Sequence, residues 1–486
     1  MRRLSICGIR VAAFALIIAA GLSSMSRTWG QTASTASTGS TTSTASTAGT
    51  ASTASTSTTA TPGGVAIDPQ GVLRTMYADP RVTMQRLRAA KQELPQHLAK
   101  PSPLRKVSLT RLESAIAKQL AEGGRPSVEM AALAGLTRLE YVFFYPESGD
   151  IVIAGPAEGF AHDALGRLVG VDSGKPCLLL DDLIVALRAY SPSGDKTNTI
   201  SVSIDPTQEG LERMQKTLLS FGGQFSGPAD VPRVVNSLQQ ALGLNEVTIK
   251  GIPAGTHFAH VLTEADYRMK LIGIGLEAPP VPMASYVSKL TLAMTAGNSL
   301  IRWFFVPNYE AIAESEDGLA MKLVGNGVKL VGEDELVGRD GSRQSSGRKA
   351  NAASRIFTSE FTKKFTMIAD NSVVYSQLRN LVDMTIAAAY IQDRDMYQQA
   401  DWNLGVFADE DQLPVVVLQA PRQVETAINA IMIGSQLVTP IGGGVTIQAR
   451  YALEQGNIQA DQGGQIKHQH DQVKLDGIAA DQWWWD

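Results

Sequence analysis

The amino-acid sequence predicts a mixed α/β or α+β protein with more than one domain. Strand-like and helix-like segments alternate between residues 199 and 276, which is typical of a mixed α/β layer. Beyond a proline-rich stretch at 279–282 the pattern becomes β-rich, and helical periodicity returns after residue 353. Hydrophobic residues make up 44% of the 486 residues and charged residues 19%, so the chain has enough apolar side chains for a large core.

The first 30 residues predict a signal peptide. Three arginines precede an unbroken apolar run at 11–22, which suits a signal sequence but is too short to span a bilayer as a helix. Small residues follow, so we expect cleavage after Ser26 or Gly30 and export by the general secretory route. An uncleaved membrane anchor is the alternative. No later segment is long and apolar enough to cross a membrane, so we expect no transmembrane span after cleavage.

Residues 31–64 form a Ser/Thr/Ala-rich spacer before the folded body. Such a composition cannot bury apolar surface, so we predict disorder there. We then divide the body at the prolines into a mixed α/β region, 65–278, and a β-rich plus helical region, 279–453.

The first region begins with helices. A polar helix is expected at 82–98 and should end near Pro95, because proline breaks helical hydrogen bonding. A second, at 108–122, opens at Ser108 and repeats apolar residues every fourth position. A β-rich run at 139–145, a turn and a second run at 151–154 predict a hairpin, and an amphipathic helix follows at 178–190.

The alternating block carries clear helix starts. Asp205-Pro206-Thr207 begins one helix, and Thr256 is an expected N-cap for a helix that continues to about residue 272. The predicted order is strand 199–204, helix 209–221, helix 234–242, strand 246–250 and helix 256–272.

The second region should open as a series of strands. Asn326-Gly327 between apolar runs is a strong hairpin signal. The Gly/Ser-containing basic stretch 339–355 predicts a flexible loop. The expected elements are strands at 301–306, 311–313, 319–324 and 328–331, helices at 354–369 and 373–391, strands at 415–418 and 445–449, and a helix at 422–434.

The segment 454–486 is polar and rich in Gln, Gly and Asp, so its composition predicts a disordered tail. It includes three adjacent tryptophans, Trp483, Trp484 and Trp485. Tryptophan offers a large contact area and is enriched at interaction hot spots, which makes this cluster a candidate partner-binding motif. The alternative is that the three side chains fold back on the body.

One helix presents candidate metal ligands. In the helix that starts at Thr256, the spacing of His257, His260 and Glu264 places all three on one face. Two imidazoles and a carboxylate could hold Zn²⁺ with one open position, as in a hydrolytic site. The spacing matches no established zinc motif, and Glu264 could instead pair with Arg268 on an ordinary helix face.

The remaining candidates for chemistry have ordinary interpretations. Asp181 and Asp182 are expected on a solvated face or as a helix cap, and Cys177 as a small buried side chain. We find no nucleophile elbow and no phosphate-binding loop. A formal net charge of −4 argues against a nucleic-acid partner.

Several stretches together resemble a family known only as a domain of unknown function in exported planctomycete proteins. They include AGPAEGF at 154–160, SIDPTQEGL at 203–211, AGTHFAHVLTEADYRMKLIGIGLE at 254–277, IRWFFVPNYEAI at 301–312, LVGNGVKLVGEDE at 323–335 and LRNLVDMTIAAAYI at 378–391. The resemblance covers about residues 65–453. It implies export, and it implies no activity and no catalytic residues.

These observations favour an extracytoplasmic protein, periplasmic or secreted, that binds an unidentified protein or envelope component and is not an enzyme. The alternative is an extracytoplasmic hydrolase, with metal assistance through His257, His260 and Glu264. A small-ligand binding protein with a cleft between the two regions is a third possibility.

Overall fold

The computed structural model describes residues 61–486 apart from 195–198, 222–230, 291–298, 309–311, 338–342, 350, 430, 434–435, 439–442, 474 and 480. The predicted signal peptide lies outside these residues, as does the spacer up to residue 60. Within the described part, no helix combines the length and the apolar character that a bilayer span requires.

A nine-stranded mixed sheet forms the larger β layer. Its strands lie in the order β1 (Thr61–Ile67), β2 (Val72–Ala78), β15 (Gln423–Glu425), β9 (Leu244–Lys250), β8 (Ile200–Asp205), β18 (Gly443–Ile447), β10 (Ser299–Pro307), β13 (Val328–Val337) and β14 (Arg343–Lys349). Most neighbours are antiparallel, whereas β15 with β2 and β10 with β18 are parallel.

A seven-stranded sheet forms the second β layer. Its order is β19 (Ile458–Ala460), β11 (Ile312–Glu314), β12 (Ala320–Leu323), β4 (Tyr141–Tyr145), β5 (Asp150–Ala157), β3 (Ser102–Ser108) and β20 (Trp484–Trp485). Two small ribbons pair β6 (Phe160–His162) with β7 (Leu168–Gly170) and β16 (Ile431–Ile433) with β17 (Gln436–Val438).

The helices pack around and between the two sheets. In chain order they are α1 (Pro80–Glu93), α2 (Gln96–Ala99), α3 (Leu109–Ala121), α4 (Val128–Ala131), α5 (Leu180–Ala189), α6 (Gln208–Ser220), α7 (Val231–Leu242), α8 (His257–Gly273), α9 (Ala352–Lys363), α10 (Phe365–Asp370), α11 (Val373–Asp393), α12 (Met396–Gln399), α13 (Ala449–Ala452) and α14 (Gln465–Asp471). The chain therefore has the mixed α+β architecture that its sequence predicts.

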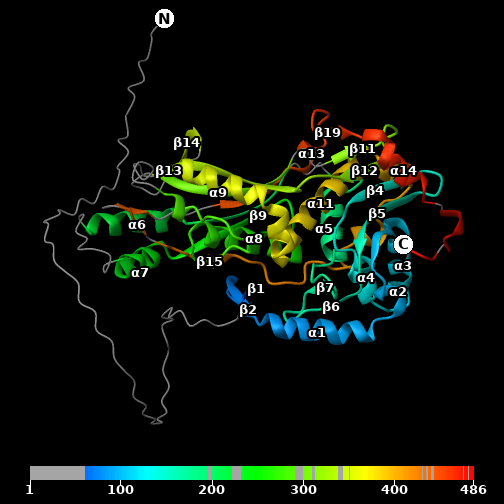
Figure 1. Ribbon diagram of the computed structural model, residues 1–486, viewed down its shortest axis with the longest axis horizontal. Helices are drawn as coiled ribbons and strands as arrows, with labels where there is room; N and C mark the ends of the chain where they lie inside the picture. Colours follow the sequence, from blue (N-terminus) through cyan, green and yellow to red (C-terminus); the bar gives the residue numbers. More distant parts are fainter. Residues whose placement is uncertain are drawn as a thin grey trace, which may run out of the picture.

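Helix α11 is the centre of the main core. Every side chain from Val374 to Ile391 is buried, which means that the helix meets protein on all sides. It packs against α5, α8, α10 and α13, and Figure 1 shows it between the elements of the two sheets. One continuous hydrophobic cluster contains residues from both sheets and from this helix.

Both sheets take strands from both sides of the proline-rich stretch at 279–282. The nine-stranded sheet combines β1 with β18, and the seven-stranded sheet combines β3 with β19. The proposed boundary at residue 279 therefore does not separate the two β layers. The physical reason is strand pairing over long sequence distances, which local composition does not encode.

Three local predictions differ from the structure. The helix expected at 422–434 is replaced by the short strands β15 and β16. The described part of the basic stretch at 339–355 contains the edge strand β14, which pairs with β13. Basic side chains are common on edge strands because they discourage pairing with other chains. Residues 415–418 join no strand ladder.

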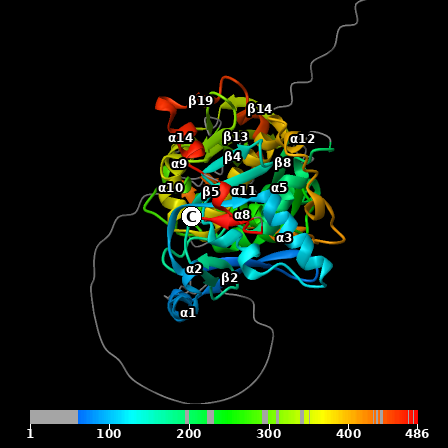
Figure 2. The same ribbon diagram turned by 90° about the vertical axis from the view of Figure 1, so that its right-hand side faces the viewer.

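The polar tail at 454–486 was predicted to be disordered, but it carries β19, α14 and β20. It covers the face of the seven-stranded sheet opposite the main core, as Figure 2 shows. The His470 ring stacks on Tyr145 with centroids 4.5 Å apart, and its Nε2 donates to the Phe144 carbonyl at 2.9 Å. The prediction failed because a few side chains, such as the buried Ile466, provide the apolar contact in a polar segment.

Candidate functional site: a groove along helix α8

A helix with buried charges forms one wall of the candidate site. Helix α8 begins after Thr256, whose hydroxyl accepts a hydrogen bond from the Ala259 amide at 3.2 Å, as an N-cap should. Glu264, Asp266 and Arg268 on this helix are all buried. Charged side chains are rarely buried unless they are paired, so α8 is where functional chemistry is most expected.

A cavity of about 340 Å³ opens beside the N-terminal half of α8. The structure places His257, His260 and Glu264 in its wall, as expected for residues on one helix face. Val261 of the same helix also lines the cavity, and the rest of the lining comes from β1, β2, α11 and two connecting segments: Gly64, Val65, Ala66, Ile67, Met76, Leu165, Arg167, Gln377, Leu418 and Gln419.

His257 forms a pair with a buried carboxylate. Its Nδ1 lies 3.0 and 2.9 Å from the two carboxylate oxygens of Asp182 on α5. Burial alone would lower the pKa of His257, but the charge and hydrogen bond of Asp182 outweigh it and raise the pKa above its usual value. The Nε2 atom lies 3.4 Å from the Gln377 amide nitrogen. The pair fixes the imidazole between α5, α8 and α11.

The other two predicted ligands also have partners within the protein. His260 Nε2 donates to the Gln419 carbonyl at 2.7 Å, and burial lowers the pKa of this histidine. The Glu264 carboxylate accepts a hydrogen bond from Arg268 Nη1 at 3.3 Å. The same guanidinium donates through Nη2 to the Glu277 carboxylate at 2.7 Å. Burial raises the pKa of Glu264, and the charge of Arg268 opposes this effect.

The predicted zinc site receives no support from this geometry. Among the described residues, no three histidine, cysteine, aspartate or glutamate side chains are grouped so that they could hold a metal ion. The helix spacing does place His257, His260 and Glu264 in one wall. However, each has its own hydrogen-bond partner, Asp182 for His257, Gln419 for His260 and Arg268 of the same helix for Glu264. The three side chains are therefore engaged separately.

A larger cavity of about 1050 Å³ follows the C-terminal half of α8. Three of its apolar residues are unusually exposed, namely Tyr77 at 63%, Met84 at 51% and Leu276 at 51%. Its remaining lining is mixed: Gly63, Thr75, Ala78, Pro80, Thr83, Leu87, Arg88, Arg167, Val171, Asp172, Ser173, Gly174, Arg268, Leu271, Glu277, Ala278, Pro279, Pro280, Asn371, Ser372 and Val373.

Arg167 lines both cavities and connects them. Its guanidinium pairs with Asp163 at 2.6 Å and donates to the Gly63 carbonyl of β1. Because Gly63 lines the larger cavity and Gly64 the smaller one, the start of β1 lies over their junction. We call the two cavities together the α8 groove. Its outer wall is the segment from β1 to α1, which Figure 1 shows below the body in blue.

Little in the sequence indicates which residues are the hydrogen-bond partners in this groove. Asp182 was expected on a solvated face or cap, yet it is buried and bonded to His257. An acidic residue inside the apolar run at 178–190 was the one available signal. Gln377 and Arg167 carry no local signal, because tertiary packing alone brings them to α8.

The tryptophan cluster lines neither cavity of the α8 groove and packs on the body. Trp483 and Trp485 are buried. The Arg105 guanidinium lies over the ring of Trp484, with its Cζ atom 4.5 Å from the ring centroid. The Trp484 indole nitrogen donates to Glu129. The three tryptophans therefore fold back on the body, which was the alternative to a free partner-binding motif. Trp484 is half-buried, whereas a partner could reach Trp483 and Trp485 only if the tail detached.

Cys177 takes its expected place as a small buried side chain, 3% exposed. Burial raises the pKa of its thiol, and the nearby charge of Glu158 adds to the effect. A thiol in this environment stays protonated and unreactive.

Comparison with known protein families identifies one domain within the chain. Residues 202–286 match the model of a family described as a protein of unknown function, DUF1598. Neither the curated proteins nor the solved structures include a match to the chain. The matched segment runs from β8 to the residues that follow α8, so it supplies His257, His260, Glu264, Pro279 and Pro280 of the α8 groove. The chain therefore contains a DUF1598 domain, and this domain forms one wall of the groove.

Proposed function

We propose that this is an exported, non-enzymatic binding protein that holds a mainly apolar ligand in the α8 groove. The observation that carries the proposal is the larger cavity. Its volume of about 1050 Å³ is at the upper end of the range for small-molecule sites. Exposed Tyr77, Met84 and Leu276 stand at this cavity, and exposed apolar side chains that gather at one concave surface mark binding sites.

The chemistry of the walls favours an amphipathic ligand. Methionine and leucine offer adaptable apolar contact, because their side chains can repack around different shapes. Arg88 lies exposed in the same lining and can meet a polar or anionic end group. Arg167 and Arg268 are already paired with carboxylates, so they shape the wall rather than supply free charge.

A fluorescent apolar probe tests the proposal. We expect 1-anilinonaphthalene-8-sulfonate to brighten on binding the protein and to lose this response in Met84→Glu and Leu276→Glu. Met367→Glu is the matched control, because Met367 is as exposed as these residues but lies outside the groove. Equal responses in all three variants would refute the groove as the binding site. If the groove variants lose the response, organic extraction and mass spectrometry of the purified protein should identify the natural ligand.

The proposed export rests on the first 30 residues. Their basic start, short apolar run and small residues fit a signal peptide. We expect the mature protein to begin after Ser26 or Gly30. N-terminal sequencing and cell fractionation test this, and a retained leader in a membrane fraction would favour the uncleaved anchor.

A hydrolase is the second candidate function, and the Asp182–His257 pair is the observation that favours it. A carboxylate that orients a histidine is the usual arrangement of a general base. In a hydrolase, His257 Nε2 would take the proton of a water molecule that attacks an ester or amide carbonyl. Turnover of p-nitrophenyl esters that His257→Gln and Asp182→Asn abolish, with folding intact, would support an enzyme. No turnover by the wild type would leave binding as the function.

A further inference from the structure

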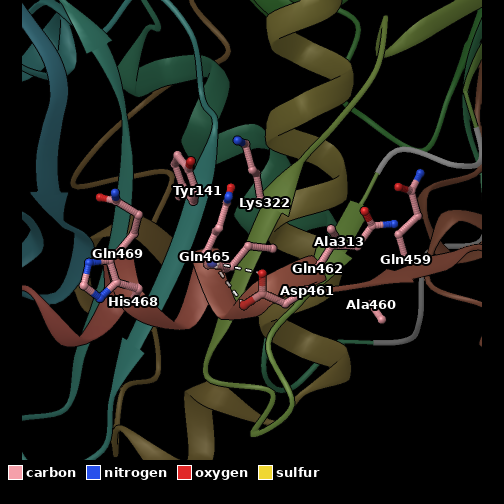
Figure 3. Close-up of a pocket in the computed structure, with 11 residues that line it drawn as sticks. Tyr141, Ala313, Lys322, Gln459, Ala460, Asp461, Gln462, Gln465, His468 and Gln469 are labelled. Carbon is pink, nitrogen blue, oxygen red and sulfur yellow. Dashed lines mark hydrogen bonds between the residues drawn. The ribbon is translucent and has the colours of Figure 1, made fainter.

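A third cavity lies apart from the α8 groove, between the tail and the seven-stranded sheet. It measures about 440 Å³ and shares no lining residue with the groove. Helix α14 and strand β19 form one side, and β4, β11 and β12 form the other (Figure 3). Its lining residues are Tyr141, Ala313, Lys322, Gln459, Ala460, Asp461, Gln462, Gln465, Ile466, His468 and Gln469.

Neutral amides dominate the polar chemistry of this cavity. Four of the lining side chains are glutamines, at positions 459, 462, 465 and 469. Figure 3 shows the Gln465 amide directed towards Lys322 and Tyr141, which project from the neighbouring strands. A primary amide presents two N–H donors and a carbonyl acceptor in one plane. The cavity can therefore both donate and accept hydrogen bonds along its length.

The charges in the lining exclude strongly ionic ligands. Both oxygens of Asp461 accept a hydrogen bond from the Ile466 amide at 3.0 Å, and one also accepts from the Lys467 amide. This carboxylate therefore caps the start of α14. Of the described residues in the lining, Lys322 alone carries a permanent positive charge, and its Nζ lies 5.2 Å from the Tyr141 ring centroid. One lysine beside an aromatic ring is a weak site for phosphate, which usually needs several donors or an arginine fork.

The walls of the cavity are held in place before any ligand binds. The Asp461 cap fixes the first turn of α14, and Ile466 on this turn is buried against the sheet. The Tyr145 hydroxyl donates to the His470 carbonyl at 3.1 Å at the other end of the helix. A preformed wall reduces the entropy that a ligand must lose on binding.

From this arrangement we infer that the cavity binds a neutral saccharide of one or two sugar rings. Sugar hydroxyls donate and accept hydrogen bonds equally well, which matches a lining of amides and the Tyr141 hydroxyl. The Tyr141 ring already stacks on Phe143, with centroids 5.3 Å apart, so Tyr141 contributes through its hydroxyl. The volume of about 440 Å³ suits a ligand of this size.

Titration of defined disaccharides tests the inference. The probes are cellobiose, maltose, mannobiose and chitobiose, and binding is followed by ligand-observed NMR and calorimetry on the protein without residues 1–30. We expect at least one probe to bind with a Kd of about 1 mM or tighter. Gln465→Ala and Lys322→Met should weaken this binding by roughly tenfold, about the value of one or two hydrogen bonds.

Gln398→Ala is the matched control, because Gln398 is an exposed glutamine outside the cavity. It should leave the affinity unchanged. Circular dichroism and the thermal midpoint show whether each variant is folded, and Gln469→Ala replaces any variant that is not. If no probe binds at about 10 mM, the inference is wrong. It is also wrong if a probe binds and the cavity variants match Gln398→Ala. Because the α8 groove shares no residue with this cavity, neither result bears on the proposed binding function.

Discussion

Replacing Asp486 with asparagine should loosen the tail from the seven-stranded sheet. The Asp486 carboxylate accepts from Arg105 Nε at 2.8 Å and from Arg105 Nη2 at 3.3 Å. The Arg105 side chain is fully buried, whereas that of Asp486 is 37% exposed. In Asp486→Asn the guanidinium keeps the Ala134 and Lys100 carbonyls as acceptors but loses its counter-charge.

The free energy that Asp486→Asn should remove from the attachment of the tail lies between two known limits. An exposed ion pair contributes about 0–1 kcal/mol, and removal of one partner from a buried pair costs about 3–5 kcal/mol. Because one side of this pair is buried and the other is partly solvated, we expect about 2 kcal/mol. A change of this size makes detachment of the tail roughly 30-fold more frequent.

Hydrogen exchange followed by mass spectrometry measures this detachment directly. The Ser108 amide donates to the Trp483 carbonyl, so peptides that cover β3 and β20 report whether the tail is bound. We expect roughly 30-fold faster exchange in Asp486→Asn. Asp481→Asn is the control, because Asp481 is exposed on the same tail. Equal exchange rates in the two variants would refute the reasoning.

The pH dependence of this effect has a definite sign. Burial would raise the pKa of Asp486, but the hydrogen bonds of Arg105 and Ser102 and the charge of Arg105 lower it overall. A lowered pKa in the folded state means that the stabilisation is present above the unfolded value, about 3.9, and is lost as the pH falls through the folded value. The ratio of exchange rates between variant and wild type should therefore approach one in acid.

Three further predictions concern the core and the groove. The pKa of His257 is raised in the folded state, so Asp182→Asn should cost more unfolding free energy at about pH 5.5 than at about pH 9 in urea titrations; an equal cost would contradict a charged pair. Gly273→Ala should lower stability by about 1–3 kcal/mol, because its new Cβ would lie 2.4 Å from the Trp303 ring, whereas Gly456→Ala meets nothing and serves as the control. Cys177 should not react with Ellman's reagent in native protein prepared without residues 1–30, which contain Cys7, but should react fully in urea, since it is buried and its pKa is raised; rapid native labelling would contradict this.

Capping residues, which act on neighbours close in sequence, predicted the starts of helices well. Thr256 and Ser108 both cap helices at the expected positions, because capping depends on residues close in sequence. Helix α11 also formed where periodicity indicated. The expected helix at 422–434 failed because its residues pair with β2, β9 and β17, all of which lie outside it in sequence. Tertiary pairing overrode the local preference.

The candidate site was predictable only in part. The shared face of His257 and His260 followed from helix geometry, and both line one cavity. What each side chain bonds to did not follow, since Asp182 and Gln419 lie 75 and 159 residues away from their histidines. A metal hypothesis built on one helix could not include these competing partners.

The position of β20 also constrains when folding can finish. This strand closes the edge of the seven-stranded sheet beside β3, although 375 residues separate Trp484 from Leu109, the first residue after β3. Until the tail has been synthesised and has crossed any membrane on its route, β3 presents an open edge and Arg105 has no carboxylate. The nascent chain would need protection from strand pairing with its neighbours for almost its whole length. A chaperone that shields open sheet edges is a natural requirement for a fold of this topology.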